Sequence, residues 1–431
     1  PARSSLASQA DAIQKRPNRC GASHDLATGG FSVNGMMHEK TLLPGGSAAT
    51  TAAAAVAEPI TLGVMGGGQL GRMFVHAAQS MGYFTAVLDP DVNSPAGRVS
   101  HRHIQTDYTD PAGLQQLAAC SAAITTEFEN VPAPALRELA KLRPVSPGAD
   151  AVAIAQDRAA EKAHFVKCGV PCAPYAVIDT AAQLDAALSA NLLPGILKTA
   201  RMGYDGKGQV RVKDAAALRA AWQDLKQVPC VLEKMLPLAL ECSVIVARGR
   251  DGQMVNFPVQ RNLHREGILA VTEVYEGHLP EALQQLAVTA ARSIAEGVNY
   301  VGVLCVEFFV LQDGSMVVNE MAPRPHNSGH YTLDACDQSQ FDLQVRTLAG
   351  LPLTQPRQHS PAIMLNLLGD VWFNDQGVMR LPDWAAVLAL PGTHLHLYGK
   401  TEARKARKMG HLNVTGATVE EVQIGRASCR E

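Results

Sequence analysis

A glycine pattern between two apolar runs does most to constrain how this chain can fold. The segment from Ile60 to Asp91 reads ITLGVMGGGQLGRMFVHAAQSMGYFTAVLDPD, with G-x-G-x-x-G at Gly66 to Gly71. Such a loop leads from a strand into a helix, and its N–H groups bind phosphate at the helix N-terminus. Asp89 ends the second run, where dinucleotide-binding domains place the acid that contacts a ribose. The segment therefore predicts a parallel α/β unit that binds a phosphate.

The charge balance excludes broad classes of partner. The chain has 38 Lys and Arg residues against 40 Asp and Glu residues, so its net charge is −2. Proteins that bind nucleic acid usually carry a clustered surplus of basic residues. A helix that spans a bilayer needs about 20 consecutive apolar residues, and no run in the sequence is that long. We therefore expect neither a nucleic-acid partner nor a membrane.

The two ends differ from the middle of the chain in composition. Residues 1–58 are rich in Ala, Ser, Gly and Thr, with few acids and no apolar periodicity. A disordered leader or an organellar transit peptide has this composition, so the plastid stroma is the expected location and the cytoplasm the alternative. Residues 416–431 are expected to be a truncated end without a terminal helix. Within them, residues 424–431, IGRASCRE, resemble translated adapter DNA.

Three folded regions are predicted between these ends, and together they indicate an α/β and α+β fold class. Apolar runs near 60–65, 84–88 and 122–126 alternate with helical stretches, as a parallel α/β unit requires. A single helix is expected over 151–167, and longer strands with hairpin signals follow residue 242. The regions are a Rossmann-like domain at 59–148, a central domain at 149–353 with a subdomain at about 170–235, and a small β-rich domain at 354–415.

A pair of carboxylates lies in the segment YVGVLCVEFFVLQDGSMVVNEMAPRPHNSGH. Asp313-Gly314 is a strong hairpin signal between two apolar runs. If these two residues form the turn, Glu307 lies opposite Glu320 and Phe309 lies opposite Val318. Two carboxylates so placed are ~5 Å apart at Cβ and repel each other. Mg²⁺, or Mn²⁺, bound between them relieves that repulsion. An ion pair with Arg324 is the alternative.

A second glycine-rich loop follows Lys198, at the end of another apolar run. The loop reads GYDGKGQ at 203–209, and no G-x-x-x-x-G-K-[ST] motif or helix accompanies it. Its glycines let backbone N–H groups approach phosphates closely. An ordinary glycine hairpin would look the same in isolation. Together with the carboxylate pair, the loop predicts a nucleotide held between two sheets.

Six motifs carry a resemblance to a known family. In this order along the chain they resemble those of the N5-carboxyaminoimidazole ribonucleotide synthetases, which belong to the ATP-grasp superfamily. The resemblance extends from about Ile60 to Val414. It implies a Rossmann-like domain, a central ATP-grasp domain with a glycine-rich flap, and a small β-rich domain. The motifs are GGGQLGRM at 66–73, TTEFENVP at 125–132, GYDGKGQ at 203–209, RNLHREGI at 261–268, NEMAPRPHNSGH at 319–330 and RKMGHLN at 407–413.

The resemblance implies an ATP site with Mg²⁺ as its metal. The residues implied to hold the phosphates are Arg158, Lys198, Gly203, Tyr204, Asp205, Gly206, Lys207, Gly208 and Gln209. Those implied to meet the adenosine are Glu233, Lys234, Met235 and Leu236, whose backbone would contact adenine, with Glu241 on the ribose and His264 nearby. Those implied at the metal are Glu307 and Glu320, beside Asn319.

The resemblance also implies two substrates, bicarbonate and 5-aminoimidazole ribonucleotide. Arg324, His326 and Asn327 would bind bicarbonate and the carboxyphosphate made from it. The residues implied to bind the ribonucleotide are Lys400 and Arg407, with Asp205 near its amine, the loop residues Gly68, Gln69 and Leu70 on its 5′-phosphate, and Glu127 on its ribose. An interdomain ion pair is an equal alternative for Glu127 and Glu129. The implied catalytic residues are Arg324, His326, Asn327, Asp205 and Lys400.

The implied reaction is the carboxylation of the ribonucleotide, with ATP converted to ADP and phosphate, in purine biosynthesis. A homodimer is expected, with a mutase that moves the carboxyl group as functional partner, either separate or fused downstream. An NAD-dependent dehydrogenase built on the GGGQLG loop is one alternative, and another ATP-grasp carboxylase or ligase is the second. A non-catalytic ATP-binding regulator would be expected to have lost at least one catalytic position, whereas Lys198, Glu307, Glu320, Arg324 and His326 are all present.

Overall fold

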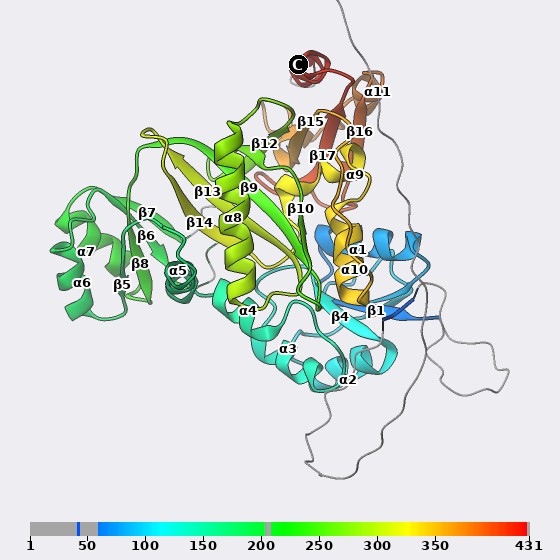
Figure 1. Cartoon of the computed structure of the whole chain (residues 1–431), viewed down its shortest axis with the longest axis horizontal. Helices are drawn as coiled ribbons and strands as arrows, with labels where there is room; N and C mark the ends of the chain where they lie inside the picture. Colours follow the sequence, from blue (N-terminus) through cyan, green and yellow to red (C-terminus); the bar gives the residue numbers. More distant parts are fainter. Residues whose placement is uncertain (1–40, 44–58, 202, 204–207, 429–431) are drawn as a thin grey trace, which may run out of the picture. The chain divides into compact units, whose positions relative to one another are not determined.

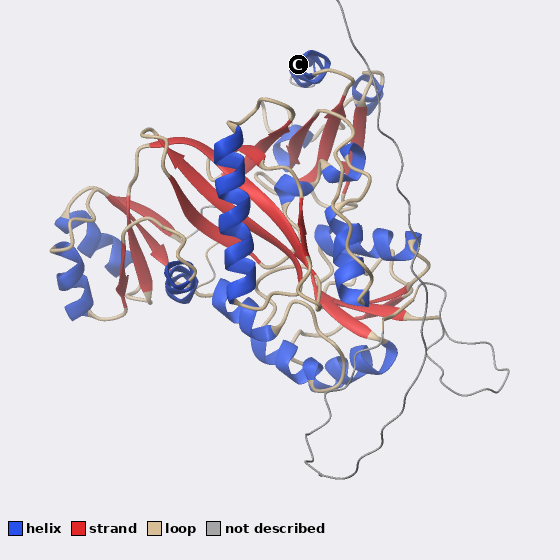
Figure 2. Ribbon diagram, viewed as in Figure 1, coloured by secondary structure: helices blue, strands red, loops and turns tan. Residues whose placement is uncertain are grey.

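The computed structural model describes residues 41–43, 59–201, 203 and 208–428. Most of the predicted leader, residues 204–207 of the glycine-rich flap and residues 429–431 lie outside the described residues. Three sheets and the helices around them make up the described part (Figures 1 and 2). Within it, no helix combines the length and apolar character that crossing a membrane requires.

The first sheet follows from the glycine pattern at residues 66–71. Its strands are all parallel and lie in the order β3-β2-β1-β4. The predicted α/β unit is therefore confirmed. The elements are β1 (Thr61–Met65), α1 (Gln69–Ser80), β2 (Phe84–Leu88), β3 (Arg102–Ile104), α2 (Pro111–Cys120), β4 (Ala123–Thr126) and α3 (Ala133–Ala140).

Residues 41–43 correct the boundary that the sequence predicted for the leader. The Leu42 N–H donates to the Ala349 carbonyl at 2.9 Å, and the Tyr83 hydroxyl donates to the Leu42 carbonyl at 2.5 Å. The Leu42 side chain packs against the core around α1. This short segment therefore belongs to the folded protein, although composition assigns it to the leader.

The predicted single helix over 151–167 is two helices, α4 (Ala149–Ala155) and α5 (Arg158–Lys167). The break is at Asp157, whose carboxylate accepts from the Ala159 and Ala160 N–H groups at 3.0 and 3.2 Å. Asp is a preferred residue at a helix N-cap, because its side chain satisfies N–H groups that lack a helical partner. The cap starts α5 at Arg158 and so fixes which residues share a face of this helix.

The second sheet is small and antiparallel, in the order β5-β8-β6-β7. Helices α6 and α7 pack beside it, with Leu184, Leu218 and Trp222 in its core. It forms the predicted subdomain near residues 170–235. The elements are β5 (Tyr175–Ile178), α6 (Ala181–Leu188), β6 (Gly195–Thr199), β7 (Gln209–Val212), α7 (Ala215–Asp224) and β8 (Cys230–Lys234).

The third sheet contains nine strands among the described residues, in the order β14-β13-β9-β11-β12-β15-β17-β16, with β10 paired to β9. Its buried residues, such as Val244, Leu304 and Val306, pack against helix α8 (Glu281–Gly297). The strands are β9 (Leu238–Arg248), β10 (Met254–Asn256), β11 (Gln260–Arg265), β12 (Ile268–Val274), β13 (Gly302–Leu311), β14 (Met316–Ala322), β15 (Ala362–Leu368), β16 (Thr393–Leu397) and β17 (Lys408–Thr415).

The C-terminal strands belong to this third sheet. Strand β15 pairs antiparallel with β12, with Val271 opposite Leu365. The small β-rich region predicted at 354–415 is therefore joined to the central domain by a continuous hydrogen-bonded ladder. The sequence does not show this, because the two paired strands are separated by about ninety residues and neither carries a local sign of its partner.

Further helices surround the large sheet. Helix α10 packs against α1, and Phe341 and Val345 enter the core of the first domain. Helix α12 contacts β15 and β17, and Arg426 pairs with Glu273 of β12. The expectation that the chain lacks a terminal helix is therefore wrong. The helices are α9 (Thr332–Ala335), α10 (Gln340–Ala349), α11 (Trp384–Leu388), α12 (Val419–Ser428) and two short 3-10 turns at Asn327–Gly329 and Gly369–Trp372.

Candidate active site

The predicted carboxylate pair is present in the hairpin of β13 and β14. Glu307 lies opposite Glu320, as predicted, but Phe309 lies opposite Val317 and not Val318. The turn is a three-residue loop, since the Leu311 N–H donates to the Ser315 carbonyl at 2.8 Å. A register shift between Glu307 and Phe308 leaves Asn319 unopposed. This β-bulge is the irregularity that aligns the two acids.

Burial and like charge act together on this pair. The Glu307 side chain is buried, and its pKa is raised to about 7 by burial first and by the charge of Glu320 second. The Glu320 carboxylate is more exposed and pairs with Arg158 at 3.3 Å. Two facing carboxylates fit a hard divalent cation, which takes one or two of them and completes its shell with phosphate and water. Within the described chain no three His, Cys, Asp or Glu residues are grouped to hold a metal.

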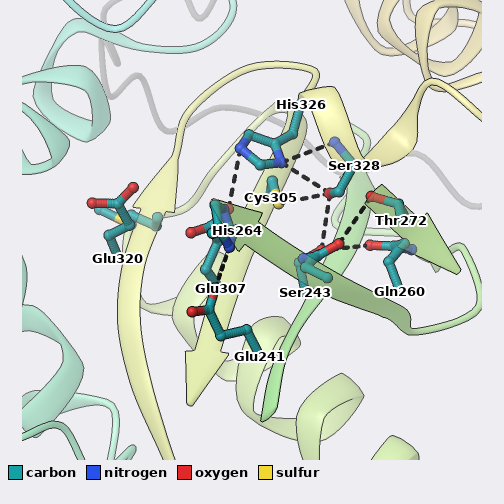
Figure 3. Close-up of polar contacts among 12 residues, drawn as sticks. Glu241, Ser243, Gln260, His264, Thr272, Cys305, Glu307, Glu320, His326 and Ser328 are labelled. Atoms are coloured by element: carbon teal, nitrogen blue, oxygen red, sulfur yellow. Dashed lines mark hydrogen bonds and ion pairs between the residues drawn. The ribbon is translucent and has the colours of Figure 1, made fainter. Parts of the chain in front are cut away.

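His326 connects the carboxylate pair to the loop that follows β14 (Figure 3). Its Nδ1 accepts from the Ser328 N–H at 3.3 Å, which leaves the proton of the neutral ring on Nε2. Nε2 lies 3.2 Å from Glu307 Oε1. Burial, and then the charge of Arg324, hold the pKa of His326 well below its usual value. The ring is therefore neutral and lies beside the Glu307 carboxylate.

A buried chain of polar side chains holds this loop against the large sheet. The Ser328 hydroxyl lies 2.9 Å from that of Ser243 on β9, which donates to Gln260 Oε1 at 3.0 Å. Asn262 on β11 donates to Ser243 at 2.9 Å and accepts from Thr272 on β12 at 3.0 Å. Buried polar groups with their partners supplied fix one arrangement of the loop. Figure 3 shows this series of polar side chains from His326 to Thr272.

Glu241 and His264 lie beside Glu307 on neighbouring strands. The His264 ring pairs with the Glu241 carboxylate, and both side chains are partly buried. Burial alone would lower the pKa of His264, but the hydrogen bond to Glu241 and the charges of Glu307, Glu241 and Glu320 raise it. The two residues predicted to lie near the ribose are thus brought together next to the acid pair.

The phosphate side of the predicted nucleotide site contains more charge than the sequence indicated. Lys198 on β6 lies 3.1 Å from Glu233 Oε2 on β8, and Lys162 on α5 lies 3.1 Å from Glu233 Oε1. All three side chains are buried. Glu161, also on α5, accepts from the Met321 N–H at 2.7 Å. Neither Lys162 nor Glu161 was predicted, and only their spacing from Arg158 on one helix signals them.

The predicted adenine hinge, residues 233–236, uses part of its backbone internally. The Lys234 N–H donates to the Pro174 carbonyl at 2.9 Å and the Met235 N–H to the Pro194 carbonyl at 3.0 Å. The Glu233 side chain serves as the partner of two lysines. The N–H groups of Lys234 and Met235 are therefore not open to a base.

The flap is described only at its ends. The Thr199 N–H donates to the Gly208 carbonyl at 2.9 Å, and Gly208 has φ +71°. Gln209 begins β7 opposite Lys198. Gly203 is described as a single residue. The predicted residues Tyr204, Asp205, Gly206 and Lys207, including the catalytic assignment of Asp205, lie outside the described residues.

Arg324 pairs with Glu129 of the first domain and not with the acid pair. Burial would lower the pKa of the guanidinium, but the charge and hydrogen bond of Glu129 raise it. Of the two predictions for Glu129, the interdomain ion pair is correct. Asn327 follows in the 3-10 turn, and its buried Nδ2 has no hydrogen-bond partner among the described residues. These side chains provide a cation and amide donors close to the acid pair.

The first glycine loop is already capped. Glu127 accepts from the Gly68 and Gly71 N–H groups at 2.9 and 3.0 Å. Asp89 accepts from the Gly67 N–H at 2.7 Å and from Tyr108 at 2.6 Å. The Gly68 N–H is therefore not open to a phosphate, which corrects the prediction for this residue. The N–H groups of Gln69 and Leu70 begin helix α1 beside it.

The basic segment after β16 lies near the same site. Lys400 Nζ donates to the Lys408 carbonyl at 2.7 Å, and Arg407 donates to the Glu402 carbonyl at 2.8 Å. The Lys408 charge lowers the pKa of both Glu129 and His326, after the larger effects of their own surroundings. The C-terminal strands thus bring positive charge to the Arg324 loop. Lys408 is a residue that the sequence did not predict.

Comparison with known proteins supports the three regions in turn. Residues 60–156 match the ribonucleotide synthetase preATP-grasp domain, residues 163–341 the ATP-grasp domain, and residues 362–424 the phosphoribosylaminoimidazole carboxylase C-terminal domain. The N5-carboxyaminoimidazole ribonucleotide synthase of Brucella melitensis biotype 1 is 44% identical over 358 residues, covering 82% of this chain and 95% of the relative. The chain belongs to the N5-carboxyaminoimidazole ribonucleotide synthase family.

Solved structures of this family share the fold. An ADP complex of an N5-carboxyaminoimidazole ribonucleotide synthetase is 38% identical with a TM-score of 0.80, covering 90% of this chain and 97% of the other. The Aspergillus clavatus enzyme in complex with ADP and 5-aminoimidazole ribonucleotide is 30% identical with a TM-score of 0.77, covering 86% and 99%. The predicted ATP-grasp fold is therefore confirmed.

Proposed function

We propose that this member of the family carboxylates 5-aminoimidazole ribonucleotide to N5-carboxyaminoimidazole ribonucleotide, using ATP and bicarbonate. The observation that carries the proposal is the position of the Arg324–His326–Asn327 loop. It joins the facing acids Glu307 and Glu320 on one side to Glu129 of the first domain on the other. This arrangement supports a nucleotide site next to an anion site. The names of the relatives supply the substrates.

The proposed chemistry has two steps. A bicarbonate oxygen attacks the γ-phosphorus of ATP, the bond to the β-phosphate oxygen breaks, and carboxyphosphate and ADP form. The substrate amine nitrogen then bonds to the carboxyl carbon and loses a proton, and phosphate leaves with the bonding electrons and takes up that proton. Phosphoryl transfer depends on positioning and charge neutralisation, which Lys198 and Arg158 supply here. The cation of Arg324 and the amide of Asn327 fit the bicarbonate and carboxyphosphate anions.

Mg²⁺ fits this proposal as the metal. The raised pKa of Glu307 and its position opposite Glu320 identify a donor pair in need of a cation. Bound between the two acids, Mg²⁺ would offset the charge on the ATP phosphates. Mn²⁺ prefers the same oxygen ligands.

Three further parts of the proposal rest on the sequence and the family. The composition of residues 1–58 supports delivery to the plastid stroma. The unstable carbamate product calls for a mutase that moves the carboxyl group to carbon, as a separate or downstream-fused domain. A homodimer is proposed as the assembly, which sedimentation would test directly.

The test is release of phosphate from ATP by the purified protein. The rate should require bicarbonate and 5-aminoimidazole ribonucleotide together, and Glu320→Gln should lower it on the order of 10²–10³-fold because charge stabilisation is lost. Glu296→Gln, at an exposed position of α8, is the matched control and should keep the full rate. Phosphate release that ignores the ribonucleotide would show that the protein is a different ATP-grasp carboxylase.

A further inference from the structure

Helix α5 presents three charged residues on one buried face. Arg158, Glu161 and Lys162 are spaced i, i+3 and i+4, so they share a side of the helix. All three are buried, with Lys162 only 1% exposed. Charged residues are almost never fully buried unless they are paired. The face therefore calls for partners: those of Arg158 and Glu161 are on β14, and that of Lys162 is on β8.

Lys162 and Lys198 share a single carboxylate. Their ammonium nitrogens lie 3.1 Å from Oε1 and 3.1 Å from Oε2 of Glu233 respectively. Only the Lys198 contact has hydrogen-bond geometry. Lys162 Nζ also lies 5.8 Å from the centre of the Tyr175 ring, a favourable position for a cation. Glu233 is thus held by two cations, one from α5 and one from β6.

The two lysines differ in what else they can reach. Lys198 stands on β6 opposite Gln209, at the base of the glycine flap, where a nucleotide's phosphates are expected. Lys162 contacts the other oxygen of the Glu233 carboxylate and is buried, with the Tyr175 ring of β5 beside it. A phosphate that draws Lys198 away would leave a lone buried carboxylate, and such an uncompensated charge is strongly destabilising. With Lys162 in place, Glu233 keeps a partner.

We propose that Lys162 is a positioning residue of the nucleotide site, the permanent counter-ion of Glu233 that frees Lys198 for the phosphates of ATP. The inference rests on the proposed function only in taking ATP as the ligand, and it is independent of the carboxylation step. Its chemistry is ion pairing alone, so no bond is made or broken.

The rest of the α5 face fixes Lys162 relative to the acid pair. The Glu161 carboxylate accepts from the N–H of Met321, the residue after Glu320, at 2.7 Å. Arg158 reaches Glu320 itself at 3.3 Å. One helix therefore binds the large sheet through Arg158 and Glu161 and the small sheet through Lys162. The counter-ion is placed by the element that also orders the edge of the metal-binding hairpin.

The experiment is calorimetric titration with ADP and Mg²⁺ on the full chain. Lys162→Met should weaken ADP binding at least about tenfold, because Lys198 becomes the sole partner of a buried carboxylate. The double variant Lys162→Met with Glu233→Gln should recover to within about threefold of wild type, since the carboxylate that retains Lys198 is gone. Lys162→Arg, which keeps a positive charge beside Glu233, should also bind ADP within about threefold of wild type. Lys167→Met, on the exposed side of α5, should bind normally.

If Lys162 were needed only for folding, the added Glu233→Gln substitution would not restore ADP binding. Restored binding in the double variant therefore identifies a positioning role. The inference is overturned if Lys162→Met binds ADP like wild type, or if the double variant binds no better than the single one. Should Lys162→Met not fold, a tenfold loss in the double variant or in Lys162→Arg overturns it. Wild type that binds ADP without carboxylating would overturn the proposed reaction and leave this inference standing.

Discussion

Glu307 is a carboxyl group whose ionisation opposes folding in the absence of a cation. Burial and the facing Glu320 raise its pKa from 4.5 to about 7. The folded state therefore holds a proton that the unfolded state releases between these pH values. Since the folded state binds more protons there, the free energy of unfolding falls as the pH rises from 4.5 to about 7. Above that range the penalty stays constant until a cation binds.

Glu307→Gln should remove this penalty, because the amide resembles the protonated acid. At pH 8 and without divalent ions, the variant should be more stable than wild type by on the order of 3 kcal/mol. Near pH 5 the two should unfold alike. Urea unfolding at both pH values, with chelator present, measures the difference. An advantage that does not change with pH would contradict the assignment, and Glu296→Gln serves as the control.

Single residues of the site could be predicted where a motif names them and not where packing selects them. Arg158 and Lys198 belong to predicted elements, and the structure pairs them with Glu320 and Glu233. Lys162 is chemically the same as Lys167 on the same helix, and although its spacing places it on the face of Arg158, only the position of Glu233 gives it a partner there. That position depends on the pairing of β6 with β8, which no local pattern shows.

The β13–β14 hairpin shows how a correct pairing can follow from an incorrect turn. A two-residue turn at Asp313-Gly314 predicts that Glu307 faces Glu320. The loop instead includes Gln312, which adds one unpaired residue on the β13 side. The bulge at Asn319 adds one unpaired residue on the β14 side. The two unpaired residues shift the register in opposite directions, so the pairing from Glu307 toward the start of β13 is as predicted. The bulge has no sequence signal of its own, so residues between it and the loop were assigned to the wrong partners.

The start of helix α1 is a second element whose details depend on contacts distant in sequence. Glu127→Ala should lower the free energy of unfolding by about 2 kcal/mol, because two backbone N–H groups lose their acceptor. Glu127→Gln keeps one acceptor oxygen and should lose about half as much. Chemical denaturation measures both. Glu138→Ala on the exposed surface of α3 is the control, and an equal effect there would contradict the capping role.

At the scale of the molecule, the large sheet unites regions that the sequence presents as separate domains. Strand β15 covers the edge of β12, and the Met364 and Ala362 side chains lie in the same core as Ile245 and Phe257. Removal of residues 354–431 would expose that edge and that core. Unpaired edges of this kind promote aggregation.

A chain ending at residue 353 should therefore fail to give a soluble protein with a cooperative thermal transition. If the C-terminal region were an independent domain, the shortened chain would fold without it. Co-expression of residues 354–431 as a separate fragment should recover soluble protein by restoring the β12–β15 ladder. Circular dichroism melting of the purified products measures both. A shortened chain that melts cooperatively on its own would contradict the single-sheet description.

The division of the site between two sheets has a consequence for motion. Glu307, Glu320 and the Ser328 loop are fastened to the nine-stranded sheet, which also carries Lys408 at the start of β17. Lys198 and Glu233 stand on the separate four-stranded sheet. A hydrogen-bonded sheet moves as one piece, whereas hinge closure is absorbed by the segments between pieces. A displacement of the smaller sheet would therefore move Lys198 and Glu233 relative to Glu307, Glu320 and Lys408, which would stay together on the larger one.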